Sequence, residues 1–400
     1  MFELETKYKE NVKIYAETIE NEAVSQIVQI ANSPLGENAH IRIMPDAHAG
    51  KGCVIGTTMQ VTDKVCPNIV GVDIGCGMLA IQIPEITDSQ IEVLDKWLGL
   101  FANKDSGVYC DAFDEIWYDH LLCRGALKHL SYFRFTQGTL GGGNHFVEIA
   151  KGEDTGYWLV IHSGSRNLGK QVAEYYQKKA EKVYENDYLQ KRKDCIAKLK
   201  AEGRDKEIEQ ALLSIKKEEY TPTGLEYLTG QDMEDYLHDM KLCQEWASVS
   251  RKILGYYALL AIGIPKEDAK IYLETIHNYI DETNMVRKGA VAAHKNQMLL
   301  IPLNMRDGSL LCKGKGNPDW NESAPHGAGR LMSRSEAKEK ISLAEFKDSM
   351  IGIKSSTICQ STIDEAPAAY KSADEIVSAI EDTVEIIDVL TPIYNFKATK

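Results

Sequence analysis

The chain has 400 residues, 44% of them hydrophobic, and a formal net charge of −13 at pH 7. That hydrophobic content is ordinary for a globular protein with a sizeable core, and the acidic balance excludes a uniformly basic nucleic-acid-binding protein. Nine cysteines are scattered without a Cys-x-x-Cys pair, and the longest apolar run, YYALLAIGI, is far shorter than a membrane-spanning helix. We therefore expect a cytoplasmic protein with reduced thiols and no membrane association.

The first half of the chain predicts helices and strands in alternation. Apolar residues at helical spacing predict a helix within residues 1–32, and short β-rich pieces predict strands between residues 41 and 84. Helical spacing returns near residues 88–102. A glycine-rich loop that enters a strand is expected at 138–150, and a strand that ends in a Ser/Gly turn is expected at 157–165.

The second half contains two long helical segments. Interleaved Lys and Glu predict a solvated helical hairpin at about residues 170–220. A second long helix is expected over 230–264, strands and loops over 271–316, and a helix near 372–387 before a short final strand. Because no linker interrupts the chain, we expect one domain of mixed α and β structure, with central sheets, surrounding helices and the hairpin as an insertion.

The segment GVDIGCGM (residues 71–78) places a carboxylate and a thiol among glycines. Glycine weakens a strand unless something approaches the backbone closely, so we expect metal ions and a ligand to approach here. Five residues form a candidate ligand set: Asp73, Cys76, His145, His162 and His277. One such histidine alone is more often structural. Together they fit two metals that share the Cys76 thiolate and keep open positions, which is typical of catalysis. Ligand type alone favours zinc.

A second candidate site surrounds His326 in the segment PHGAGR, with Arg330 at the end of the segment and Arg334 four residues further on. Small neighbours leave the imidazole accessible, and arginines bind phosphate oxygens in a fork geometry. The pattern indicates a phosphoryl or nucleotidyl acceptor; the alternative is an anion-binding loop in which the histidine is only supporting. Residues 287–334 contain eight Lys and Arg against three acidic residues, which fits an anionic ligand.

Six motifs occur in the order found in RtcB-type RNA ligases: MPDAHAGKGCVIG, GVDIGCGM, GGGNHFVEI, HSGSR, HN and APHGAGRLMSR. The chain resembles this family from about residue 40 to the C-terminus. The resemblance implies an enzyme that uses GTP and manganese to join RNA ending in a 2′,3′-cyclic phosphate or a 3′-phosphate to RNA with a 5′-hydroxyl end. It leaves open the physiological RNA, repair or tRNA splicing as the setting, the oligomeric state and the need for an activating protein.

The resemblance also implies a role for each matching residue. His326 would accept the guanylyl group of GTP, and the metals would be two manganese ions rather than zinc. The first would bind Asp73, Cys76 and His145, and the second Cys76, His162 and His277. Contacts to the guanylate are implied for Asn144, Glu148, Ala328, Arg330, Tyr370 and Lys397. Positions near the metals or the RNA phosphates are Asp46, His48, Arg166, Lys288 and Arg334.

Two segments depart from the family pattern. IPLNMRDG (residues 301–308) replaces a Gly-Ser-Met-Gly-Thr type loop, and the tail LTPIYNFKATK lacks the usual Arg before Pro and Gly after Lys. We therefore expect a divergent branch of the family.

Two other functions are alternatives to ligation. A binuclear metal phosphoesterase acting on RNA ends would need neither His326 nor a guanine pocket around Glu148 and Lys397. An RNA-end-binding protein without turnover would lack a metal ligand or the nucleophile, and the sequence retains all of them. We therefore expect a ligase.

Overall fold

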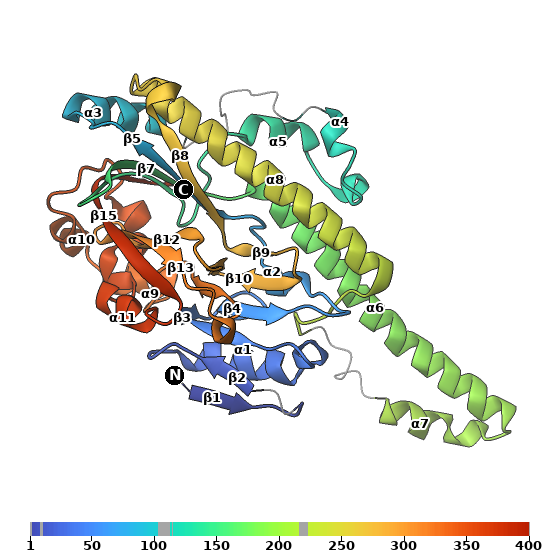
Figure 1. The fold of residues 1–400 in the computed structure, drawn as a ribbon. Coiled ribbons are helices and arrows are strands. Elements are labelled where there is room, and N and C mark those ends of the chain that lie inside the picture. The colour runs from blue at the N-terminus through green and yellow to red at the C-terminus, as the bar shows by residue number, and fades with distance from the viewer. Residues whose placement is uncertain (1, 9–10, 103–112, 114, 216–222, 400) are drawn as a thin grey trace.

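The computed structural model describes residues 2–8, 11–102, 113, 115–215 and 223–399 (Figure 1). Two sheets dominate it. The first has six strands, in the order β1 (Phe2–Glu5), β2 (Asn11–Ile14), β3 (Arg42–His48), β4 (Ile55–Gln60), β10 (Met285–Lys288) and β9 (Asn278–Ile280). Neighbouring strands are antiparallel except the parallel pair β2 and β3.

The second sheet has seven strands, and all neighbours are antiparallel. Their order is β12 (Met298–Asn304), β13 (Gly308–Gly314), β15 (Val384–Lys397), β6 (Phe146–Gly152), β7 (Gly156–Ser163), β5 (Gly77–Ile83) and β8 (Lys270–Ile276). A two-stranded sheet of β11 (Ala290–Ala292) and β14 (Ser323–Pro325) lies between the larger sheets, because β11 contacts β4 and β8 while β14 contacts β3.

Helices cover one face of the seven-stranded sheet. Alternate residues of β5, β6 and β7 form a core with α3 (Asp88–Trp97) and α8 (Gly230–Ala261), as the period of two along a strand requires. A capping box between Thr87 and Gln90 fixes the start of α3. The remaining α-helices are α1 (Asn21–Asn32), α2 (Pro67–Val70), α4 (Glu115–Tyr118), α5 (Leu130–Thr136), α6 (Arg166–Ala201), α7 (Ile208–Ser214), α9 (Arg334–Lys340), α10 (Leu343–Ser349) and α11 (Ala373–Ala379).

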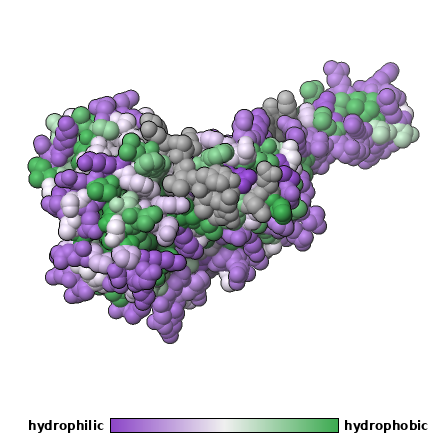
Figure 2. All heavy atoms as spheres, turned by 90° about the horizontal axis from the view of Figure 1, so that it is seen from above, coloured by the Kyte–Doolittle hydropathy of each residue, from purple (hydrophilic) through white to green (hydrophobic). Residues whose placement is uncertain are grey.

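The long helix α6 has a buried beginning and an exposed end. Leu168, Val172 and Tyr176 belong to a core shared with α1 and α8, whereas most residues beyond Ala180 are exposed. The distal half of α6 and the returning helix α7 protrude from the rest of the molecule (Figures 1 and 2). The predicted helical hairpin is therefore confirmed up to residue 215, and its last predicted residues lie outside the described part of the chain.

The mixed α and β class is confirmed, but two predicted helices are wrong in part. Residues 2–5 and 11–14 are strands, and the first helix begins only at Asn21. Near the C-terminus α11 ends at Ala379, and the following strand is fourteen residues long rather than short. That the chain forms one domain stays a prediction. No helix in the described ranges is long and apolar enough to cross a membrane.

Candidate active site

Strand pairing brings the predicted metal ligands to one end of the seven-stranded sheet. Cys76 directly precedes β5 and His145 directly precedes β6. His162 lies near the end of β7, and His277 directly follows β8. Because these neighbouring strands run antiparallel, the starts of β5 and β6 lie beside the ends of β7 and β8. Residues far apart in the sequence therefore meet at one edge.

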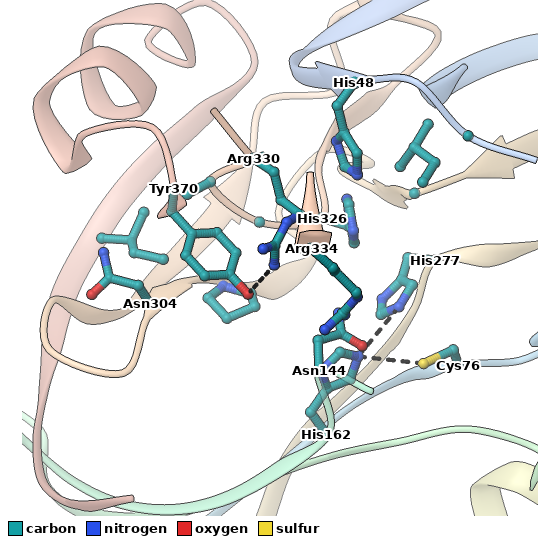
Figure 3. Close-up of a pocket in the computed structure, with 18 of the residues that line it drawn as sticks. His48, Cys76, Asn144, His162, His277, Asn304, His326, Arg330, Arg334 and Tyr370 are labelled. Atoms are coloured by element: carbon teal, nitrogen blue, oxygen red, sulfur yellow. Dashed lines mark hydrogen bonds between the residues drawn. The ribbon is translucent and has the colours of Figure 1, made fainter. Parts of the chain in front are cut away.

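The ligand atoms form two groups that share one thiol. Asp73, Cys76 and His145 make the first group, and Cys76, His162 and His277 make the second; within each group the atoms lie within 4.8 Å of one another. The sulfur of Cys76 is 3.4 Å from Nε2 of His145 and 3.3 Å from Nε2 of His162. Nε2 of His162 is in turn 3.4 Å from Nε2 of His277 (Figure 3).

The chemistry of these groups fits bound cations. Burial lowers the pKa of His162 and of His277 well below 6.5, so both imidazoles stay neutral and keep a lone pair. Nδ1 of His145 is 2.9 Å from the carbonyl oxygen of Leu140, which favours the tautomer that presents a free Nε2. Nδ1 of His277 is buried without a hydrogen-bond partner among the described residues. Convergent neutral imidazoles around a thiol and a carboxylate are an arrangement that a metal stabilises.

Two of the three glycines in the segment 71–78, Gly75 and Gly77, allow close packing of the backbone, which differs from the expected role. A Cβ on Gly77 would lie 2.1 Å from the carbonyl oxygen of Thr275, and one on Gly75 would lie 2.8 Å from Cα of Gln244 in α8. The neighbouring strand and helix occupy the space beside Gly77 and Gly75, whereas Gly71 lines the cavity described below, so the expected approach of a ligand stays a prediction for Gly71 alone. Glycine here lets β5 start tightly against β8 and α8.

Arg251, a buried residue of α8, anchors the same strand ends. Its Nη1 donates hydrogen bonds to the carbonyl oxygens of Gly75, at 2.8 Å, and Ser163, at 2.7 Å. Its charge is balanced by Glu274 at 2.9 Å. One buried guanidinium thus fixes the residue before Cys76 and the residue after His162.

His326 follows β14 and is held by a buried carboxylate. Nδ1 of His326 is 2.6 Å from Oδ2 of Asp46 in β3, and the same oxygen accepts the backbone N–H groups of His326 and Gly327. This contact favours a proton on Nδ1 and leaves the Nε2 lone pair free. Gly329 has a φ of +74°, and a Cβ there would lie 2.4 Å from the carbonyl oxygen of Asp46. The glycine therefore allows the loop to close over Asp46.

His326 also adjoins the ligand groups. Its ring centroid is 4.8 Å from that of His277. His48 is on the same side, with Nδ1 2.9 Å from the carbonyl oxygen of Asp46, and burial lowers its pKa to about 4. The imidazoles of His48, His326 and His277 lie on one side of the pocket, and Tyr370 and Asn304 on the other (Figure 3). The candidate nucleophile and the candidate metal site thus share one cavity.

This cavity has a volume of about 640 Å³ and unites most of the predicted site residues. Those that line it are Asp73, Cys76, His162, His277, His326, Asn144, Glu148, Ala328, Arg330, Tyr370, Lys397, His48, Lys288 and Arg334. Asp46, His145 and Arg166 are not part of this lining. A Cβ on Gly141 would lie 2.0 Å from Nη1 of Arg166 and 2.9 Å from Nδ1 of His145. The guanidinium of Arg166 therefore packs directly against Gly141.

Two of the predicted phosphate-binding cations already form ion pairs with carboxylates of the protein. Arg334 is 2.7 Å from Asp364 and 2.5 Å from Glu365, and Lys397 is 3.1 Å from Glu365. The hydroxyl of Tyr370 donates to Glu365 at 2.6 Å. Burial alone would raise the pKa of Glu365, but Lys397 and Arg334 outweigh it and lower that pKa to about 2.

Carboxylates from outside residues 287–334 therefore reduce the positive excess expected of that segment. Arg287 is paired with Asp281, and Lys313 lies 3.1 Å from Glu385. Lys288 is buried, and its Nζ donates to the carbonyl oxygens of Lys51 and Asn68, both at 2.9 Å. The segment supplies an ordered ionic network rather than a free basic patch.

One wall of the cavity is a face of β6 and β15. Glu148 and Asn395 are paired across the strands, as are Phe146 and Lys397 two residues along. Nδ2 of Asn395 donates to Oε2 of Glu148 at 2.7 Å, and Nζ of Lys397 donates to the carbonyl oxygen of Asn144 at 3.0 Å. Burial raises the pKa of Glu148 to about 8 despite Asn395 and Lys397. The wall presents buried polar groups to a ligand.

Residues at this site that were not predicted from the sequence include Arg251, Asp364, Glu365 and Asn395. Glu365 stands in the segment EAPAAYK beside the predicted Tyr370, which was the available signal. The partners of the other three come from distant segments, and no local pattern indicated them.

The cavity joins two candidate metal-binding groups that share one thiol, a histidine oriented by a carboxylate, and a polar wall. The family model of the tRNA-splicing ligase RtcB matches residues 26–108 and 128–398. The chain belongs to this RtcB family of ligases.

Individual members are similar over nearly the whole length. The chain is 29% identical to RNA-splicing ligase RtcB1 of Escherichia coli strain ATCC 25922 and 28% identical to RNA-splicing ligase RtcB of strain K12, covering 97% of this chain and 98% of each relative. It is 26% identical to tRNA-splicing ligase RtcB of Nanoarchaeum equitans, covering 84% of this chain and 83% of that protein.

Proposed function

We propose that this chain is a GTP- and manganese-dependent RNA ligase. It joins RNA ending in a 3′-phosphate, or in a 2′,3′-cyclic phosphate that is first hydrolysed, to RNA with a 5′-hydroxyl end. The setting is RNA repair or tRNA splicing in the cytoplasm, and one domain carries the activity. Membership of the family and the composition of the cavity support this proposal.

In the first step, Nε2 of His326 attacks the α-phosphorus of GTP. The new P–N bond forms as the bond to pyrophosphate breaks, and His326 carries the guanylyl group. Asp46 keeps the Nδ1 proton in place and stabilises the cationic ring that develops on attack, since a negative charge 2.6 Å away favours imidazolium.

In the second step, an oxygen of the RNA 3′-phosphate attacks the guanylyl phosphorus and the P–N bond breaks, which returns the histidine. In the third step, the 5′-hydroxyl of the other RNA attacks the RNA phosphorus, the bond to GMP breaks, and the hydroxyl proton is released to solvent. Each step exchanges one phosphorus bond for another, so no oxidant or reductant is required.

Two manganese ions are proposed to occupy the two ligand groups, where they supply positive charge for phosphoryl oxygens in the transition state. Asp73, Cys76 and His145 would hold one, and Cys76, His162 and His277 the other. Their proximity to His326, whose ring is 4.8 Å from that of His277, supports a shared role in guanylyl transfer.

The remaining lining residues are proposed to bind the nucleotide and the RNA. Guanylate contacts are assigned to Asn144, Glu148, Ala328, Arg330, Tyr370 and Lys397. RNA phosphate or metal-proximal roles are assigned to His48, Arg166, Lys288 and Arg334. For Arg334 this means exchanging Asp364 or Glu365 for a phosphate oxygen, which its 38% side-chain exposure supports.

The observation that carries the proposal is the placement of His326 on Asp46 beside the ligand groups. An RNA-joining assay tests it against the phosphoesterase alternative. Purified protein with GTP and manganese should convert a 3′-phosphate RNA and a 5′-hydroxyl RNA into one longer product. Removal of the terminal phosphate without a joined product, in the presence of GTP, would favour the phosphoesterase and contradict ligation.

A further inference from the structure

Two buried acceptor atoms on the β6–β15 wall have no partner among the described residues. They are Oε1 of Glu148 and Oδ1 of Asn395. Both residues are 1% exposed, and both line the cavity. Buried acceptors left unsatisfied cost free energy, so a pair of them facing a cavity indicates a ligand that brings hydrogen-bond donors.

The register of the strands explains why the two atoms act together. Glu148 and Asn395 are directly paired across β6 and β15, which places their side chains on the same face of the sheet. The amide of Asn395 is oriented by its bond from Nδ2 to Oε2 of Glu148, at 2.7 Å. Because Nδ2 of Asn395 donates to the Glu148 carboxylate, Oδ1 of Asn395 is left as an acceptor without a partner among the described residues.

We propose that Asn395 is a specificity-determining residue that reads the exocyclic 2-amino group of the purine base. This inference rests on the proposed function, because it concerns the base of the nucleotide that guanylates His326. The base edge of guanine offers three hydrogens: one on N1 and two on the 2-amino group. The Glu148 carboxylate accepts the N1 hydrogen and one amino hydrogen, and Oδ1 of Asn395 accepts the other amino hydrogen.

Two related bases fit this wall less well. Hypoxanthine keeps the N1 hydrogen but lacks the amino group, so Oδ1 of Asn395 stays buried and unsatisfied. Adenine presents an acceptor nitrogen at N1, which faces the carboxylate unfavourably. The wall therefore distinguishes GTP from ITP through the amino group alone, which gives a clean chemical probe of Asn395.

The test measures binding of GTP and ITP, and adduct formation from each, with wild type and Asn395→Leu, which has similar volume. Wild type should prefer GTP over ITP by about 5- to 150-fold, the range for an unsatisfied buried acceptor. In Asn395→Leu the GTP-to-ITP affinity ratio should fall to near 1, because ITP no longer leaves Oδ1 unpaired. Asn395→Val is a second variant that also removes Oδ1 and suits a β-strand. The comparison of GTP with ITP on the wild-type protein remains informative if both variants fail to fold.

A matched control is Asn304→Leu, the same substitution in the same cavity. Asn304 is bound within its own loop, donating to Asp307 at 2.7 Å, so the GTP-to-ITP ratio should stay at the wild-type value. Equal loss of GTP and ITP in Asn395→Leu would mean that Asn395 only orients Glu148, and would overturn the inference. Equal affinity of wild type for both nucleotides would overturn it too. Absence of adduct with every nucleotide would contradict the proposed function instead.

Discussion

Nδ1 of His326 lies 2.6 Å from Oδ2 of Asp46, a carboxylate with no exposed surface. Asp46 belongs to β3 of the six-stranded sheet, and His326 follows β14 of the small sheet, so the pair is separated by 280 residues in the chain. Their contact fixes how the imidazole faces the cavity that also holds the metal ligand groups.

Asp46→Asn should impair guanylyl transfer more than folding. The amide keeps the size of the carboxylate but lacks its charge, and it permits the wrong tautomer of His326. We expect the rate of adduct formation to fall on the order of 10²-fold or more, as for other carboxylate–histidine pairs. Single-turnover kinetics with labelled GTP would measure it. Asp388→Asn is the matched control, since Asp388 also accepts backbone N–H groups, but at the β6–β7 turn.

The number of bound manganese ions should depend on whether the substituted ligand belongs to one ligand group or, like Cys76, to both. Cys76 belongs to both ligand groups, whereas His145 belongs to one. After dialysis against manganese, elemental analysis should find two ions per wild-type chain, about one in His145→Ala and almost none in Cys76→Ala. Cys312→Ala removes a buried thiol elsewhere and should keep both ions. Retention of both ions by Cys76→Ala would contradict the shared site.

Nucleotide affinity should depend on pH through Glu148. Burial raises its pKa to about 8, so below that pH the carboxyl is largely protonated and accepts hydrogen bonds poorly. Affinity for GTP should therefore rise by up to about tenfold per pH unit as the pH approaches 8 and level off above it. Equilibrium titrations of wild type and Glu148→Gln would measure this. The variant should bind weakly with a flatter profile; parallel profiles would contradict the role of Glu148.

Glu365 should matter for stability as well as for the site. Its folded-state pKa of about 2 is below the ordinary 4.5, so its stabilisation is fully present above 4.5 and is lost as the pH falls towards 2. Glu365→Gln removes the carboxylate that is 3.1 Å from the buried Lys397 and should lower the free energy of unfolding by about 3 kcal/mol near neutral pH. Denaturant titrations should show that the difference in the free energy of unfolding between wild type and Glu365→Gln becomes smaller as the pH falls from 4.5 towards 2. The exposed substitution Glu339→Gln should change little.

The gathering of the predicted ligands could be expected from the sequence because these residues stand next to strands with recognisable motifs. Cys76, His162 and His277 each flank a β-rich segment, and antiparallel pairing then brings them together. The pairing partners of Arg334 and Asn395 were not predictable. Glu148 and Asn395 are 247 residues apart, and only the register between β6 and β15 joins them.

The errors in the fold have a similar origin. Strands β1 and β2 have four residues each, too few for an alternating pattern to outweigh apolar spacing shared with the following helix. Val384 and Ile386 were read as helical, but they pair with β13 in the sheet. In both segments, pairing with distant strands determines the secondary structure, and the local spacing of apolar residues does not reveal that pairing.

The most direct test of the account is to label the protein with α-labelled GTP and manganese and then resolve it by denaturing electrophoresis. Wild type should retain an acid-labile label, as a phosphoramidate does, and His326→Ala should retain none. His294→Ala removes an exposed histidine outside the cavity and should label like wild type. Label retained by His326→Ala, or absent from wild type with its metals bound, would contradict guanylyl transfer through His326.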